Sequence, residues 1–345
     1  METHSAEIPV GFLEVTEPLA GIAEKNGYAV ERLSSKTIIT APLGQVSFVG
    51  DEKITKLRFS SRTKAELQLF KELYADRLKK LGLGAKIKWE KSVGSIPFNQ
   101  IRCEVTSCER ISNNFKRLRL QGNFSVFAGD SAGLHFRFLL GPAGVGWPYL
   151  DDNGLTLWPL GISEWHRPVF TVRRIASDAK WIDVDIALHI GGRVTNWLKE
   201  LKVGDEIAIN GPSGMKMPMA DKMFLFGDET AMPAIMRILE NNPPGTRVNA
   251  TLALRDAKDL QAMPNDKQLT IKTVKMEDES GLLNELYENC HKFSDCFLFF
   301  AAERSQSSKA REFIKTSSIL VKSSKISSYW TKTNQAYENI SNQER

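Results

Sequence analysis

The residues best able to do chemistry gather in one short segment, HRPVFTVRR at 166–174. It combines a histidine and three arginines with the aromatic ring of Phe170 and the hydroxyl of Thr171. Because alternate side chains of a strand share a face, guanidinium groups and a hydroxyl can converge there with the ring beside them. Such a set suits an anion joined to a flat, partly apolar body. An exposed strand with solvated charges is the alternative interpretation of this segment taken alone.

Two glycine turns add to this chemistry. Gly191 and Gly192 run into the helical pattern RVTNWLKEL, and unpaired N–H groups at a helix start favour anions. Gly227 follows the apolar strand MFLF, with Thr230 as a candidate cap and Pro233 in the first helical turn. Ligands of parallel α/β sheets bind at the carboxyl ends of the strands, so this second turn predicts a dinucleotide site. No GxGxxG fingerprint is present, and an ordinary capped connection remains the alternative.

The elements that must position these residues fall into three ranges. Residues 1–92 predict a small α+β domain, in which RTKAELQLFKELYADRLKKLG has helical periodicity and ends at Gly82. Residues 93–218 contain short alternating strands separated by turns, which predict an antiparallel barrel. From 219 to 345 strands alternate with helices, which indicates a Rossmann-like parallel sheet followed by a C-terminal tail.

Composition limits the classes of protein. The 345 residues are 42% hydrophobic and 25% charged, and the net charge of +5 is spread along the chain. This pattern predicts no nucleic-acid partner. Neither a signal peptide nor an apolar run of about 18 residues is visible, so we expect a cytoplasmic protein without a membrane partner. We also expect a monomer. No CxxC pair occurs and no metal site is expected; the thiols are Cys103, Cys108, Cys290 and Cys296.

Several residues are interpreted as structural. His135 and His189 lie in predicted strands, where a packed histidine is commoner than a catalytic base. Five tryptophans are assigned to packing in the barrel: Trp147, Trp158, Trp165, Trp181 and Trp197.

A barrel with an anion-binding helix, followed by a nucleotide-type domain, resembles the flavin reductases related to ferredoxin reductase. Within that group the motifs resemble the siderophore-interacting proteins, the cytoplasmic ferric-siderophore reductases. RPVFTVR is similar to the family's Arg-x-Tyr-Thr segment with Phe170 in place of tyrosine, and HIGGRVTNW to its Gly-Gly-x-Ala-Ser-x-Trp helix start. GDETAMPAI matches its Gly-Asp-Glu-Thr-Ala-x-Pro-Ala turn and SSYW its closing Tyr-Trp. The likeness covers about 93–330, and residues 1–92 look like an accessory domain that some members carry.

The resemblance implies an FAD site on the barrel. Arg167 would pair with the FAD pyrophosphate, Phe170 would lie against the isoalloxazine or ribityl region, and Thr171 would hydrogen-bond near the flavin N5 as the catalytic position. Gly192, Val194 and Thr195 would meet the phosphates. The resemblance also assigns three further FAD-binding residues: Arg173, His189 and Gly191.

It also implies a nicotinamide site, with NADPH or NADH as the electron donor. Arg255 follows the strand RVNATLAL, where a guanidinium suits a 2′-phosphate, so NADPH should be preferred. Ala302 stands where the family has glycine. The remaining residues of this site are Gly227, Asp228, Glu229, Thr230 and Glu303.

Electrons would then pass from NAD(P)H through FAD to a ferric siderophore, which releases ferrous iron. Catecholate siderophores are anionic, and the resemblance places basic residues at Arg137 and Lys325 beside the flavin. At the third basic position Ser213 stands in place of arginine, which leaves Lys216 as a substitute. Two alternatives stay open: a flavin reductase with another acceptor, such as free flavin or a quinone, and a siderophore-binding protein without enzymatic activity.

Overall fold

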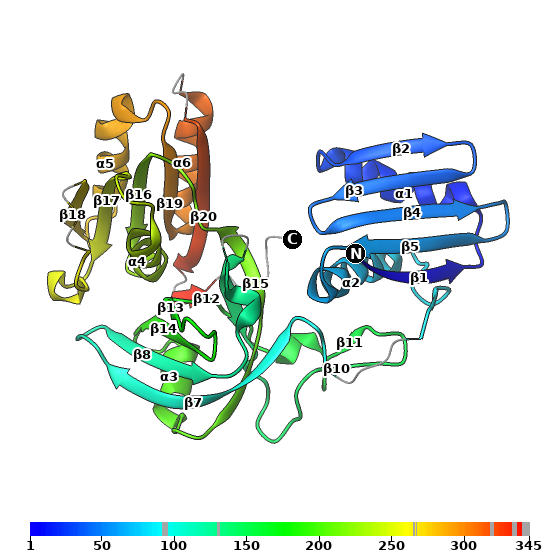
Figure 1. Ribbon diagram of the computed structural model, residues 1–345, viewed down its shortest axis with the longest axis horizontal. Coiled ribbons are helices and arrows are strands. Elements are labelled where there is room, and N and C mark those ends of the chain that lie inside the picture. The colour runs from blue at the N-terminus through cyan, green and yellow to red at the C-terminus, as the bar shows by residue number, and fades with distance from the viewer. Residues whose placement is uncertain are drawn as a thin grey trace. The chain divides into compact units, whose positions relative to one another are not determined.

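A computed structural model describes residues 1–91, 96–129, 132–264, 266, 268–317, 321–332 and 337–339. The chain forms two compact units, shown in Figure 1. The first comprises Met1–Gln100 with Gly141–Trp165, and the second comprises Ile101–Leu140 with His166–Arg345. The expected ranges did not anticipate that residues 141–165 pack with the N-terminal part. The expected boundary at residues 92 and 93 lies outside the described residues.

The first unit is an antiparallel sheet of order β2-β3-β4-β5-β1-β6 covered by two helices (Figure 1). Aromatic side chains of the sheet and of the second helix, among them Phe59, Phe70 and Tyr74, fill its core. The second helix is the predicted one: Thr63 caps it by accepting from the Glu66 N–H, and Gly82 lies just beyond its end with φ of +75°. The elements are β1 (Glu2–Ile8), α1 (Phe12–Lys25), β2 (Ala29–Leu33), β3 (Lys36–Ala41), β4 (Gly44–Gly50), β5 (Thr55–Ser61), α2 (Lys64–Lys80) and β6 (Lys88–Trp89).

Residues 141–165 form a hairpin-like insertion, with β10 (Tyr149–Leu150) paired to β11 (Thr156–Leu157). The buried Lys71 on α2 donates from its ammonium to the carbonyl oxygen of Gly154 at 3.2 Å, and Thr156 hydrogen-bonds Glu72 of the same helix. These contacts explain why the insertion belongs to the first unit. The structure also corrects the prediction that the tryptophans of this insertion pack in the barrel. The rings of Trp147 and Trp158 both pack on Trp165 within the insertion.

The predicted barrel is a seven-stranded antiparallel sheet of the second unit, in the order β12-β9-β15-β7-β8-β14-β13. Its core includes Phe136, Phe138 and Val184, and Trp197 packs on it as predicted. The elements are β7 (Gln100–Arg110), β8 (Phe115–Gln121), β9 (Gly133–Phe138), β12 (Val169–Thr171), β13 (Arg174–Ile175), β14 (Trp181–Ala187), α3 (Arg193–Glu200) and β15 (Glu206–Lys216).

The predicted parallel sheet has the order β18-β17-β16-β19-β20, with β21 added antiparallel at one edge. Helix α4 covers one face and α5 and α6 the other, so β16 and β19 are buried on both faces, as their apolar runs require. Strand order reverses between β16 and β19, which is where such sheets bind ligands. The elements are β16 (Lys222–Asp228), α4 (Met232–Asn241), β17 (Arg247–Leu254), β18 (Leu269–Lys275), α5 (Gly281–Asn289), β19 (Phe297–Glu303), α6 (Arg304–Thr316), β20 (Ser323–Lys332) and β21 (Tyr337–Asn339).

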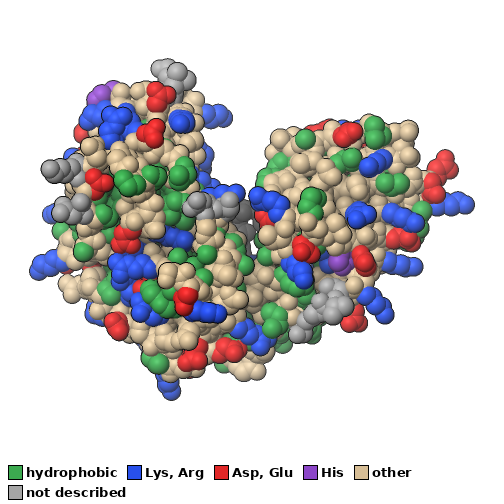
Figure 2. Space-filling view, viewed as in Figure 1, with side chains coloured by type: hydrophobic (Ala, Val, Ile, Leu, Met, Phe, Trp, Pro, Cys, Tyr) green, Lys and Arg blue, Asp and Glu red, His purple; other side chains and the backbone are tan. Residues whose placement is uncertain are grey.

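Short 3₁₀ turns lie at Ser125–Phe127, Ile162–Glu164, Ala257–Asp259 and Cys290–Lys292. Basic and acidic side chains are interspersed on the face seen in Figure 2, without a continuous basic surface. Among the described residues no helix is long and apolar enough to cross a membrane.

Candidate functional site

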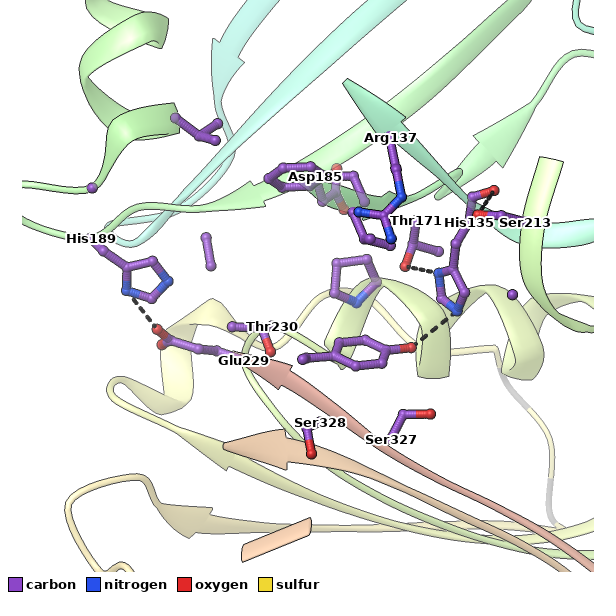
Figure 3. Close-up of a pocket in the computed structure, with 18 of the residues that line it drawn as sticks. His135, Arg137, Thr171, Asp185, His189, Ser213, Glu229, Thr230, Ser327 and Ser328 are labelled. Atoms are coloured by element: carbon purple, nitrogen blue, oxygen red, sulfur yellow. Dashed lines mark hydrogen bonds and ion pairs between the residues drawn. The ribbon is translucent and has the colours of Figure 1, made fainter. Parts of the chain in front are cut away.

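A pocket of about 400 Å³ opens in the second unit (Figure 3). Strands β9 and β12, the start of α3, the turn after β16, and β20 all contribute to its lining. The predicted site residues that line it are Arg137, Phe170, Thr171, His189, Gly192, Val194, Thr195, Glu229, Thr230 and Lys325. The fold therefore brings barrel residues together with residues more than 100 positions later in the chain.

Strand pairing positions the β12 side of the pocket. Phe170 and Thr171 lie opposite Phe136 and His135 of β9 in the antiparallel register. The Phe170 ring is half-buried and meets Phe138 edge-on, with ring centroids 5.1 Å apart. Phe170 therefore packs against the barrel core and also lines the pocket.

Arg137 reaches the pocket from the neighbouring strand. Its guanidinium donates to the carbonyl oxygen of Arg167 at 3.0 Å, which fixes the backbone just before β12. Arg167 itself does not line the pocket, and its predicted contact with a pyrophosphate stays a prediction.

Helix α3 opens onto the pocket at its N-terminus. Gly191 has φ of +78°, which favours glycine, and Gly192 is the N-cap without a side-chain cap. The Thr195 hydroxyl accepts from the His189 N–H at 3.0 Å, which holds the turn. Arg193 also lines the pocket and was missed by the sequence analysis, because its motif position marks only the helix start. Helix N–H groups and a guanidinium together make an anion site.

His135 was interpreted as structural, yet it lines the pocket and connects two of its hydroxyls. Its Nδ1 lies 3.1 Å from Thr171 Oγ1, and its Nε2 lies 3.1 Å from the phenol oxygen of Tyr329 (Figure 3). Burial, with Arg237 and Lys325 nearby, lowers the pKa of His135 to about 4, so the ring is neutral at pH 7. A strand pattern could not reveal this, because Tyr329 comes from the other sheet.

The turn after β16, which contains Asp228 and Glu229, differs from the prediction that Thr230 caps the following helix. Asp228 is buried and accepts from the Thr230 N–H at 2.9 Å and from the Trp330 indole at 2.7 Å, and burial raises its pKa. Ala231 is the N-cap of α4, so Thr230 does not cap the helix as predicted; its hydroxyl donates to Asp228. The turn is therefore held from inside the protein.

Gly227 permits a close approach between the end of β16 and the start of α4, across the turn that follows it. A Cβ there would come within 2.7 Å of the Ala231 Cβ, so only glycine lets α4 lie against β16. Glu303 likewise has a structural position, since its carboxylate caps α6 by accepting from the Ser305 N–H. Neither residue lines the pocket.

Glu229 is the residue of the pocket lining whose carboxyl group has a raised pKa. Its side chain is fully buried, and desolvation raises its pKa to about 7 although Arg255 donates to it at 2.8 Å. His189 Nδ1 lies 3.7 Å from the other carboxyl oxygen, and burial, with Arg255 nearby, lowers the pKa of that imidazole to about 4. Arg255 also donates to the carbonyl oxygen of Leu188 at 2.7 Å, so its guanidinium links the two sheets.

The structure corrects the prediction that Arg173 binds FAD. Its guanidinium is fully buried, makes two bonds of 2.5 and 2.6 Å to Glu240 of α4, and donates to Gln261. It does not line the pocket. Arg237 of α4 also donates to the carbonyl oxygen of Val172 at 2.8 Å, so α4 clamps the end of β12. Tertiary pairing therefore gives Arg173 a structural role where the motif predicted cofactor contact.

The predicted substrate cations separate into two groups. Arg137 and the exposed Lys325 line the pocket, whereas Lys216 ends β15 and does not. Ser213 lines the pocket where the family pattern has arginine, and its hydroxyl donates to the His135 carbonyl at 3.3 Å. Lys216 is thus not brought to the place of the missing arginine. No group of three or more His, Cys, Asp or Glu side chains that could hold a metal is found in the part of the chain that the structure describes.

Comparison with known proteins agrees with this geometry. Residues 104–216 match the family "Siderophore-interacting FAD-binding domain", and residues 220–333 match "Siderophore-interacting protein". The ferric vibriobactin reductase ViuB of Vibrio cholerae is 27% identical over 171 residues, which cover 47% of this chain and 61% of that relative's length.

Solved structures of similar fold include a siderophore utilization protein from T. fusca, with a TM-score of 0.60, 23% identity, and coverage of 71% of this chain and 98% of that one. The siderophore-interacting protein SipS from Aeromonas hydrophila has a TM-score of 0.56 at 21% identity, with coverage of 68% and 93%. At these identities the likeness shows the fold. The two family matches together span more than half of the sequence, and the chain belongs to the siderophore-interacting protein family.

Proposed function

We propose that this protein is an FAD-dependent oxidoreductase that passes electrons from NAD(P)H to an anionic ferric siderophore, from which ferrous iron is released in the cytoplasm. The observation that carries the proposal is a single pocket that joins an open helix N-terminus, an aromatic ring with a hydroxyl, and two cations from different sheets. The family match supports the flavin and the siderophore.

The residues present fit FAD. The start of α3 has no side-chain cap and adds the Arg193 guanidinium, which suits a pyrophosphate. Phe170 supplies a half-buried ring for a flat, partly apolar body, and the Thr171 hydroxyl lies beside it. Phenylalanine lacks the hydroxyl of the tyrosine usual in the family, so the ring contributes contact area alone.

A bound flavin supplies the conversion that the reaction needs, since it accepts two electrons as hydride and releases them singly to ferric iron. The task of this chain is to position the reactants and provide charge. Phe170 and Thr171 orient the flat ligand, α3 and Arg193 hold its anionic part, and the clamp of α4 on Val172 keeps β12 in place.

The nicotinamide donor is assigned to the same pocket. The turn after β16 lies where the strand order reverses, and Glu229, Thr230 and Pro233 face the cavity. We keep the proposal that Arg255 favours NADPH, although its present bonds to Glu229 and Leu188 must rearrange to meet a 2′-phosphate. Arg255→Ala should abolish the preference in steady-state kinetics with both nucleotides; an unchanged ratio of kcat/KM values would refute it.

Arg137 and Lys325 provide the docking charge for the substrate. Both are cations on the lining of the pocket, and a ferric triscatecholate is an anion that such a pair attracts. Cations at the pocket lining fit an anionic acceptor better than neutral quinones.

The first test is the visible spectrum of the purified protein before and after incubation with FAD. Bands of oxidised flavin near 380 and 450 nm, roughly as for any bound flavin, are expected. A protein that binds no FAD would leave a siderophore-binding protein without redox activity. A flavoprotein that reduces free flavin or a quinone but not a ferric siderophore would be a reductase of another acceptor.

A further inference from the structure

His135 is the centre of a hydrogen-bonded chain that runs from one sheet to the other. Thr171 of β12 lies on its Nδ1 side and Tyr329 of β20 on its Nε2 side, each at 3.1 Å (Figure 3). All three residues line the pocket. This hydrogen-bonded chain of three side chains is therefore a feature of the site that the motif matches alone do not explain.

The His135 ring is held in one orientation. Gly214, with φ of +74°, lies against it so closely that a Cβ there would be 2.4 Å from the His135 Cδ2. Tyr329 meets the ring edge-on, with ring centroids 5.7 Å apart. Because the imidazole is 7% exposed and packed on both sides, its two nitrogens keep these two partners.

A neutral imidazole has one N–H donor and one acceptor nitrogen, so the chain can run in only two directions. In the first, Tyr329 donates to Nε2, Nδ1–H donates to Thr171, and the Thr171 hydrogen points into the pocket. In the second, Thr171 donates to Nδ1, Nε2–H donates to Tyr329, and the phenol hydrogen points into the pocket. Neither hydroxyl has another hydrogen-bond partner among the residues that the structure describes, so the strengths of the donors and acceptors decide between the two directions.

The chemistry of the groups favours the first direction. A phenol is a stronger hydrogen-bond donor than an aliphatic hydroxyl, and the imidazole lone pair is the strongest acceptor of the chain. We infer that Tyr329 and His135 are positioning residues that orient the Thr171 hydroxyl as a donor into the pocket, where it selects a ligand atom with a lone pair. With FAD as the ligand, an identification that rests on the proposed function, that atom is the ring nitrogen N5 of the oxidised form.

A fixed donor at this place has a consequence for the ligand. The oxidised ring has a lone pair at N5, whereas the reduced ring carries a hydrogen there, so the oriented hydroxyl favours the oxidised form. Tyr329→Phe removes the phenol donor and lets the Thr171 hydroxyl turn toward Nδ1. At a fixed electrode potential the ratio of reduced to oxidised bound flavin should then rise about tenfold, which is about 30 mV for a two-electron couple.

The decisive measurement needs no cofactor. In the apoprotein labelled with ¹⁵N-histidine, the His135 signals, assigned by their loss in His135→Asn, should show the proton on Nδ1 at pH 7. Imidazole in water prefers the proton on Nε2, so this result identifies the chain direction. In Tyr329→Phe the signals should move toward the Nε2-protonated form, whereas the matched control Tyr287→Phe on α5, outside the pocket, should leave them unchanged.

Protonation on Nε2 in the parent protein would overturn the inference, and an unshifted Nδ1 form in Tyr329→Phe would remove Tyr329 from it. If His135→Asn fails to fold, the His135 signals are assigned by elimination, from Asn variants of the other four histidines, His4, His166, His189 and His291. Failure to bind FAD would refute the proposed function but not the orientation of the hydroxyl.

Discussion

Replacing Arg137 and Lys325 together by alanine should weaken reduction of a ferric triscatecholate and spare a neutral quinone. Both cations line the pocket, Lys325 is exposed, and Arg137 is half-buried. An exposed ionic contact of this kind contributes about 0.5 to 1 kcal/mol. The two losses together correspond to a decrease of about five- to thirtyfold in kcat/KM.

The assay compares both acceptors at several salt concentrations, with rates divided by bound flavin measured from its absorbance. That correction is needed because Arg137 also donates to the Arg167 carbonyl oxygen, so its removal can disturb the FAD site. Ions screen exposed charges over about 8 Å at physiological strength, so added salt should slow the parent more than the double variant.

Lys216→Ala is the matched control, since it removes a lysine that the structure does not bring to the pocket. It should leave kcat/KM for the triscatecholate unchanged. Equal losses with both acceptors and equal salt responses would refute the docking role of Arg137 and Lys325. That result would leave the FAD assignment intact but would reject a ferric siderophore as the substrate.

Three other substitutions test separate parts of the structure. Arg167→Ala should weaken FAD binding by about 1.5 to 3 kcal/mol if its guanidinium pairs with the pyrophosphate, and an unchanged dissociation constant in a fluorescence titration would contradict this. Arg173→Met removes the fully buried guanidinium that binds Glu240 through two bonds, while the partly exposed Glu240 keeps Arg174. The free energy of unfolding should fall by about 1.5 to 3 kcal/mol in urea titrations, and a loss below about 0.5 kcal/mol would show that the Arg173–Glu240 pair is not structural. Glu229 has a pKa raised to about 7 in the folded protein from 4.5, so the folded state binds the extra proton and stability should fall as pH rises from about 4.5 to 7. Glu229→Gln should flatten that pH dependence, and a slope identical to the parent's would show that Glu229 is not its source.

The helix α2 and the two sheet types of the second unit could be predicted because each depends on local pattern. Leu67, Phe70 and Tyr74 recur at helical spacing and are buried on one face of α2. The apolar runs of β16 and β19 reflect burial on both faces of a parallel sheet. Such periodicities are visible in a single sequence because they follow from backbone geometry.

Residues 141–165 could not be assigned from pattern alone. Their short strands resemble those of the barrel, but Lys71 and Glu72 of α2 hold them in the first unit. Contacts between positions about 80 residues apart leave no periodic signal in the sequence.

The sequence by itself determined the family, the order of the sheets, and the short segments that reach the pocket. Phe170, Thr171, Gly192 and Glu229 all line it, because motif spacing reflects local backbone geometry. The direction and partners of each side chain were decided by tertiary structure alone. Arg173 turns to Glu240 and Asp228 to Trp330, while His135 meets Tyr329 across 194 positions of sequence. Pairing of buried charges and hydrogen-bond donors depends on which elements pack together, and that arrangement exists only in the folded chain.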